Sequence, residues 1–146
     1  MSEEIMVVEN TGVAQSNGNG NDFAIPRGFV CTVDTSTMEG KLRVMNALNG
    51  STSLSEHMNE TLCVKDIVTT KGVRSRTGEQ CINTHLLLAN GETLFSQSDG
   101  VARAIGVLVA LFTINGHCDF GDGVNVQCIE QKLNNGNTLK TIVPVL

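Results

Sequence analysis

The sequence predicts a mostly β fold in which one helix interrupts a series of antiparallel strands. Short runs that alternate apolar and polar residues recur along the chain, and turn residues such as Asn-Gly separate them. Only one stretch, at about residues 98–114, carries apolar residues at helical spacing. The chain has 146 residues, of which 40% are hydrophobic, and this suits one domain with its own core.

The chain is expected to begin with a flexible arm, residues 1–27, followed by a single domain, residues 28–146. The arm is acidic and then rich in Asn and Gly. Such residues lose much conformational entropy on ordering and bury little apolar surface. Residues 5–8 are its only apolar patch. They could dock on the domain or on a neighbouring subunit, and a loosely held tail fits equally well.

Residues 28–48 are predicted to form a β-hairpin, because two alternating runs flank a turn rich in Asp, Ser and Thr. The apolar face of the pair would consist of Phe29, Cys31, Val33, Leu42 and Val44. Side chains alternate along a strand, so Lys41 and Arg43 would point the other way. The second strand would therefore have an apolar underside and a cationic outer face.

The remaining β structure follows from the same alternation. The predicted strands are residues 61–70, 80–89, 92–96, 124–131 and 138–145. Residues 49–59 are polar and residues 71–78 are bounded by Gly, so both are predicted to be loops. Asn90-Gly91 predicts a type I′ turn, which needs a positive φ at both central residues.

Residues 98–114 form the single clear helix of the prediction. Ser98 and Asp99 can cap its start, and Asn115-Gly116 can end it. Its expected buried face consists of Val101, Ala104, Ile105, Leu108, Leu111 and Phe112. Other positions are apolar too, which indicates either deep burial or packing against another subunit.

Strands, one helix and further strands, in this order, match a small OB-like antiparallel Greek-key barrel. The alternative is an open α+β antiparallel sheet covered by one helix.

Several classes of function find no support. The sequence has no GxSxG, Walker loop, HExxH or GxGxxG motif, and its three histidines are scattered. The five cysteines are odd in number and never paired as CxxC, which favours reduced thiols. Residues 117–122 contain metal-ligand types without a second pair at finger spacing. The longest apolar run, residues 101–112, is too short to span a bilayer. We therefore expect no enzyme, no metal site, no cofactor and no membrane partner.

Binding of single-stranded nucleic acid is better supported. Six of the ten basic residues lie between positions 41 and 76, namely Lys41, Arg43, Lys65, Lys71, Arg74 and Arg76. A cationic barrel surface can follow phosphates while aromatic rings stack on bases. Tyr and Trp are absent, and Phe95 is the ring expected to be exposed. The alternative for these bases is an ordinary solvated surface. The net charge of −5 argues against a histone-like polycation.

Two longer stretches carry a family resemblance. They are VDTSTMEGKLRVMNA, within residues 28–48, and ANGETLFSQSDGVARAIGVLVALF, which ends at residue 112. With the two final strands, they resemble the single-stranded-DNA-binding proteins of small protein-primed phages of Gram-positive hosts, the phi29-like group. The resemblance covers residues 28–146 and leaves out the arm.

The resemblance implies an OB-like, non-catalytic protein that coats displaced single strands during phage DNA replication in the host cytoplasm. Phe95 takes the place of a family aromatic residue, and Lys41 and Arg43 lie on the matching strand. The family's tyrosines in the middle region have no counterpart here, so charge would have to substitute for stacking. The alternative is a structural or protein-interaction subunit, for phage assembly or host interaction, that binds no nucleic acid. A homo-oligomer could form through residues 98–114 or residues 5–8.

Overall fold

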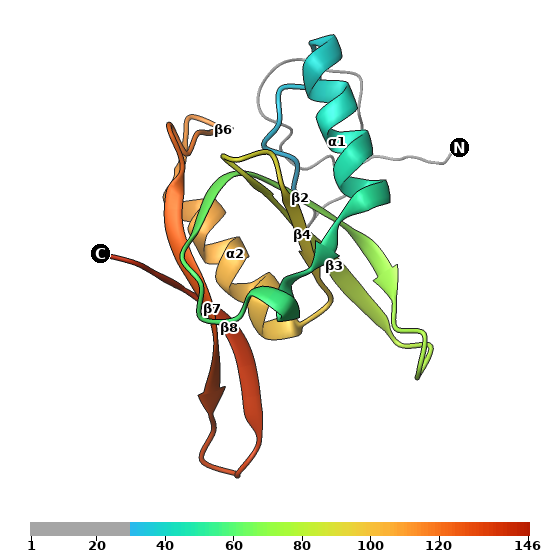
Figure 1. The fold of residues 1–146 in the computed structure, drawn as a ribbon, viewed down its shortest axis with the longest axis vertical. Helices are drawn as coiled ribbons and strands as arrows, with labels where there is room; N and C mark the ends of the chain where they lie inside the picture. Colours follow the sequence, from blue (N-terminus) through green and yellow to red (C-terminus); the bar gives the residue numbers. More distant parts are fainter. Residues whose placement is uncertain (1–29) are drawn as a thin grey trace.

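A computed structural model describes residues 30–146 of the chain (Figure 1). The predictions for residues 1–27 and for Phe29 lie outside these residues. The helices of the described part are α1 (Met38–Gly50), α2 (Asp99–Leu111) and the short 3-10 helix η1 (Leu54–His57). Its strands are β1 (Thr52–Ser53), β2 (Leu62–Val73), β3 (Gln80–Leu88), β4 (Thr93–Ser96), β5 (Thr113–Ile114), β6 (His117–Cys118), β7 (Val124–Lys132) and β8 (Thr138–Pro144). None of these helices is long and apolar enough to cross a membrane.

Six strands form one curled sheet in the order β1-β4-β3-β2-β7-β8. All neighbours are antiparallel except β1 and β4, which run parallel. A β-bulge between Val64 and Asp66 marks where β2 changes partner from β7 to β3, and bulges bend a strand and increase its twist. The mostly β, OB-like prediction is confirmed, with the sheet curled into a half-barrel that ends at β1 and β8.

Helix α2 packs on one face of the sheet, where the larger core lies. Residues that point to this face from β2, β3, β4 and β7 include Ile67, Leu86, Leu94 and Val126, and all are buried. The predicted start of the helix is confirmed, because the Ser98 hydroxyl accepts a bond from the Val101 N–H. Its burial differs from the prediction. Val101 and Ile105 are buried, whereas Leu111 is 73% exposed. The helix therefore buries one stripe and leaves part of its apolar surface open.

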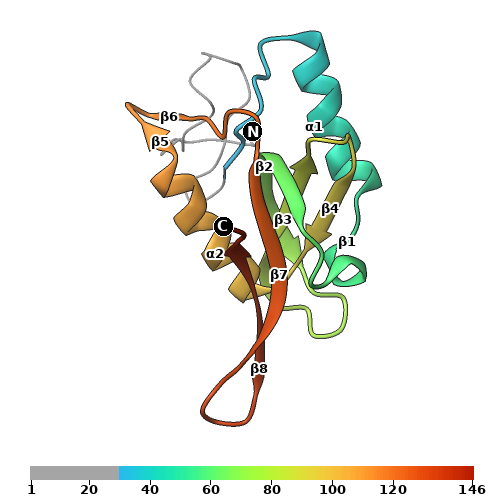
Figure 2. The same ribbon diagram turned by 60° about the vertical axis from the view of Figure 1, so that its left-hand side comes forward.

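Helix α1 covers the opposite face, and here the predicted hairpin is wrong. Figures 1 and 2 show α1 and α2 on the two sides of the β2–β4 region. The chain around Cys31 does run beside β2, with a bridge from Cys31 to Val68, and it bends at Val33. The second run is helical instead. Its buried positions, Gly40, Val44 and Ala47, follow helical spacing. They pack in a second core that includes Val68 and Leu87.

The Asp-, Ser- and Thr-rich segment is a helix start rather than a hairpin turn. The Asp34 carboxylate accepts bonds from the backbone N–H and the hydroxyl of Ser36. Thr37 is the N-cap of α1, and its side-chain oxygen accepts a bond from the Gly40 N–H at 3.0 Å. Side chains of these types satisfy the free N–H groups of a first helical turn. The alternation of residues 41–44 was too short to distinguish a strand from a helix.

Three smaller differences concern loops and turns. Residues 49–59 were predicted to be a polar loop, but they contain β1 and η1, and Leu54 is only 2% exposed in the core. Strand β2 extends to Val73, so Lys71 lies on a strand. Gly91 has a positive φ and Asn90 does not, so the predicted type I′ turn is wrong. Two consecutive residues with positive φ, as a type I′ turn requires, occur instead at Asn115-Gly116, in the turn between β5 and β6.

The contact between α2 and β8 depends on a glycine, and this makes a prediction. A Cβ at Gly100 would overlap the carbonyl oxygen of Lys140 and the side chain of Leu139. Gly100→Ala should therefore lower the free energy of unfolding by about 1–3 kcal/mol, as overpacking does. Urea denaturation measures this. Gly106→Ala on the same helix is the control, because nothing lies within 4 Å of its Cβ position. It should be neutral or stabilising by up to about 1 kcal/mol, and equal losses in both variants would contradict the prediction.

Candidate nucleic-acid interface

Two of the predicted site residues, Lys41 and Arg43, lie on α1 and not on a strand face. Lys41 is exposed, and its Nζ donates to the backbone oxygen of Thr35 at 2.6 Å. Arg43 donates to Asp66 at 3.0 Å, and the other carboxylate oxygen of Asp66 accepts from Thr32. Arg43 therefore ties α1 to β2, and Asp66 offsets its charge. The role of both residues in DNA binding stays a prediction.

Lys65, Lys71 and Arg76 are exposed along or beyond β2. Lys65 lies at the β-bulge, where its Nζ donates to the Gly121 oxygen at 3.1 Å. Lys71 lies near the far end of β2, and Arg76 in the turn that joins β2 to β3. Lys71 and Arg76 thus share one hairpin, while Lys65 lies close to the opposite end of the strand.

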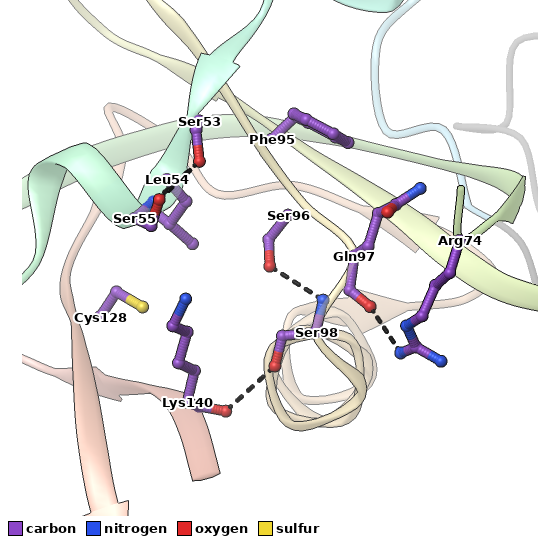
Figure 3. Close-up of a pocket in the computed structure, with 10 residues that line it drawn as sticks. All are labelled: Ser53, Leu54, Ser55, Arg74, Phe95, Ser96, Gln97, Ser98, Cys128 and Lys140. Atoms are coloured by element: carbon purple, nitrogen blue, oxygen red, sulfur yellow. Dashed lines mark hydrogen bonds between the residues drawn. The ribbon is translucent and has the colours of Figure 1, made fainter. Parts of the chain in front are cut away.

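Arg74 and Phe95 are brought together at one pocket of about 340 Å³ (Figure 3). Arg74 follows β2 and is held by charge: its guanidinium lies 3.1 Å from Asp99 and 3.6 Å from Glu79. It also donates to the Gln97 backbone oxygen at 3.0 Å. Phe95 belongs to β4, near the edge of the sheet, and is half-buried. Arg74 and Phe95, 21 positions apart in the sequence, thus line the same pocket, and their role in DNA binding stays a prediction.

Phe95 also lines a second pocket, of about 440 Å³, on the sheet face that carries α1. The other residues of this pocket are Leu48, Asn49, Ser51, Thr70, Asn83 and His85. The Phe95 ring stacks on His85, with centroids 5.7 Å apart and planes 26° apart. The Asn83 oxygen accepts a bond from the Gln97 amide at 2.9 Å. This orients the Asn83 amide, whose side chain lies where a Cβ on Gly72 would be. An aromatic surface bordered by oriented amides is suited to a planar polar ring.

The protonation of His85 follows from its neighbours. The Ser51 hydroxyl donates its single proton to the Ala47 oxygen at 2.5 Å. Ser51 must therefore accept at its 3.1 Å contact with His85 Nδ1, so Nδ1 carries the proton. Burial lowers the pKa of His85, and a backbone hydrogen bond at Ala47 partly offsets this. The neutral ring beside Phe95 then has Nε2 as an acceptor.

Several residues of these two pockets were not predicted from the sequence. In the first pocket these are Ser53, Ser55, Ser96, Gln97, Ser98 and Lys140, which come from β1, η1, β4, the segment between β4 and α2, and β8. Only the pairing of β1 with β4, and the packing of β8 against α2, brings them to Phe95 and Arg74. The Leu-Phe-Ser-Gln-Ser step at 94–98 is visible in the sequence, but Lys140 lies 42 positions after its last residue.

The thiols are free, as predicted, in all five cysteines. Burial raises the pKa of Cys31 to about 11 and also raises the pKa values of Cys118 and Cys128. These side chains behave as small apolar core residues. Within residues 30–146, no group of three or more His, Cys, Asp or Glu side chains could hold a metal ion.

With this geometry in place, comparison with known proteins identifies the family. The family model of phage single-stranded DNA-binding proteins of the phi29 type matches residues 24–142. The chain belongs to this family. The resemblance seen in the sequence is thereby confirmed, and the match includes both pockets that Phe95 lines. No curated protein and no solved structure matches the chain.

The buried histidine of this family member leads to a pH prediction. The pKa of His85 is lowered in the folded protein, so the unfolded chain binds a proton first as the pH falls. Neutral His85 therefore makes its full contribution to the free energy of unfolding above the ordinary histidine pKa of about 6.5. This contribution is lost as the pH falls through the pKa of His85 in the folded protein. Between about pH 7 and about pH 5, the urea midpoint of the wild type should fall more than that of His85→Asn. The pKa of His57 is raised by Glu60 in both proteins, so its opposite effect cancels in the comparison. Parallel pH profiles would contradict this assignment.

Proposed function

We propose that this protein binds single-stranded DNA and coats the strands displaced during phage DNA replication, in the cytoplasm of the bacterial host. The family match over residues 24–142 carries the proposal. We further propose that it acts without catalysis, as a protecting and ordering coat. The arm at residues 1–27 and the single domain at residues 28–146 remain part of this proposal.

The structure supports a binding surface centred on Phe95. This half-buried residue lies on the short strand β4 and lines two pockets, and its ring stacks on His85. Stacking of a base on an aromatic ring is tolerant of sequence, because every base has a π-face. Lys71, Arg74 and Arg76 lie on or beside the β2–β3 hairpin, which pairs with β4 through β3. In this proposal, their charges attract the phosphates of a strand that crosses Phe95.

The three other candidate residues contribute at a greater distance in this proposal. Arg43 is paired with Asp66, and Lys41 and Lys65 each donate to a backbone oxygen. Lys41 and Lys65 keep their full charge while doing so, because a carbonyl is neutral. They would raise the concentration of an anionic strand near the surface without holding one particular phosphate.

A protein-interaction role has separate support in the exposed apolar surface at the end of α2. Val107, Leu111 and Ile114 are 57%, 73% and 71% exposed. A monomer normally shows few large apolar side chains so close together. The helix predicted at 98–114 ends at Leu111, and Ile114 belongs to β5. We propose that this surface, formed by the end of α2 and by β5, is where copies of the protein associate. The other predicted contact, residues 5–8, lies outside the described residues.

The first test compares nucleic acids. A gel shift at low salt should retain oligo-dT and leave a duplex of matching length free, and added salt should weaken retention because counterions are released when phosphates are neutralised. Equal retention of both, or of neither, would contradict the proposed function. A stable oligomer that ignores DNA would instead support the alternative of a structural subunit.

The second test removes the ring. Phe95→Ala should weaken oligo-dT binding by about 1–3 kcal/mol, the usual contribution of one stacked base, without changing the salt dependence. Fluorescence anisotropy with a labelled oligo-dT measures both quantities. Phe112→Ala is the control, because that ring lies beyond α2, edge-to-face against Phe120 at 5.3 Å. Unchanged affinity in Phe95→Ala, or an equal loss in both variants, would rule out Phe95 as the stacking residue.

A further inference from the structure

The pocket in Figure 3 has the composition of an anion site. It is lined by four serines, two cations, Gln97, Phe95, Leu54 and Cys128, and by no carboxylate. Its volume of about 340 Å³ is within the range of small-ligand sites. We call it the serine pocket, meaning the space between Ser53, Ser55, Ser96, Ser98 and Lys140.

Lys140 is the available charge of the serine pocket. Its side chain extends from β8 into the pocket (Figure 3), and it is half-buried. The described part of the chain places no carboxylate within salt-bridge distance of it. Arg74, the other cation, is already held between Asp99 and Glu79. An anion entering the pocket would therefore meet its strongest attraction at Lys140.

Hydroxyl groups complete the set of donors. Ser96 accepts a bond from the Ser98 N–H at 3.0 Å, which leaves its own proton to donate. The hydroxyls of Ser53 and Ser55 lie 2.7 Å apart. One of these two must donate to the other, so one proton of the pair also remains available. Glu130 lies opposite Lys140 in the register of β7 and β8, but it neither lines the pocket nor forms a salt bridge with Lys140. An ammonium with two hydroxyl donors, in a pocket that no carboxylate lines, suits the oxygens of a phosphate.

We propose that the serine pocket holds a backbone phosphate of the DNA strand, with Lys140 as its cation. This inference rests on the proposed function, and it adds a residue and a ligand group that the family match does not assign. Phe95 lines the same pocket, so the phosphate belongs to a nucleotide next to the base stacked on that ring. The strand then runs from the β2–β3 hairpin, across β4, to the β7–β8 hairpin.

Lys140→Gln tests the proposal through salt dependence. The variant keeps much of the aliphatic stem and removes one charge. For single strands, each neutralised phosphate contributes about 0.7 to the slope of log K against log salt. The slope for oligo-dT should therefore be about 0.7 shallower in Lys140→Gln, and its affinity deficit should shrink about fivefold for each tenfold rise in salt. Lys140→Arg should retain the wild-type slope.

The matched control is Lys132→Gln. Lys132 ends β7 in the same hairpin, is exposed and does not line the pocket. Lys132→Gln removes the same charge as Lys140→Gln, but it should leave the slope of log K against log salt nearly unchanged. An equal slope in Lys140→Gln and wild type, or an equal change in both variants, would overturn the phosphate site. Thermal unfolding of each variant checks that it is folded. Ser96→Ala is a second test variant. It removes a hydroxyl donor but no charge, so it should weaken binding without changing the slope of log K against log salt.

Two further outcomes separate the possible explanations. If wild-type protein does not bind oligo-dT at all, the proposed function fails, whereas binding with an unaffected Lys140→Gln slope overturns only this inference. A phosphate that belongs to a strand predicts that the dinucleotide dTpdT competes better than inorganic phosphate at equal concentration. Equal competition would overturn the strand assignment in favour of a site for free phosphate.

Discussion

Burial of β2 on both faces is the constraint on which the rest of the structure depends. Ile67 and Val68 are neighbours, so their side chains point to opposite faces, and both are almost completely buried. Ile67 belongs to the core beneath α2, and Val68 to the core beneath α1. A sheet that is apolar on both faces at its centre needs cover on both sides. This is why one helix covers each face of the sheet. A sheet with one solvent-exposed face would need a helix on the other face only.

Covering the centre leaves the edge of the sheet for a ligand. Strand β4 has only the two-residue strand β1 outside it, and the polar residues 96–98 lead from the end of β4 into α2. Phe95 lies at this edge between two pockets, one lined by serines and cations and one by amides and a histidine. A nucleotide has an anionic end and a planar polar end. In the proposed binding mode, the two pockets that Phe95 lines receive these two ends.

The arrangement of charges explains how a protein of net charge −5 could hold DNA. Several basic side chains are tied to structural partners, as Arg43 is to Asp66 and Arg74 to Asp99. Such pairs position elements, and their net attraction for an anion is small. The cations without a carboxylate partner in the described residues, such as Lys71 and Lys140, therefore matter more than the overall count. Local placement decides the field that a phosphate meets, because salt screens charges beyond about 10 Å.

The sequence by itself determined the elements whose pattern is local and long. The five predicted strands after residue 60, the start of α2 at Ser98 and the free thiols all follow from alternation, capping and spacing, and the family resemblance was readable as well. Tertiary structure decided the rest. Residues 41–44 alternate as a strand would, and only the core around Val68 shows why Gly40, Val44 and Ala47 form a buried helical stripe. The placement of Phe95, Arg74 and Lys140 around one pocket likewise depends on long-range pairing, which no local pattern encodes.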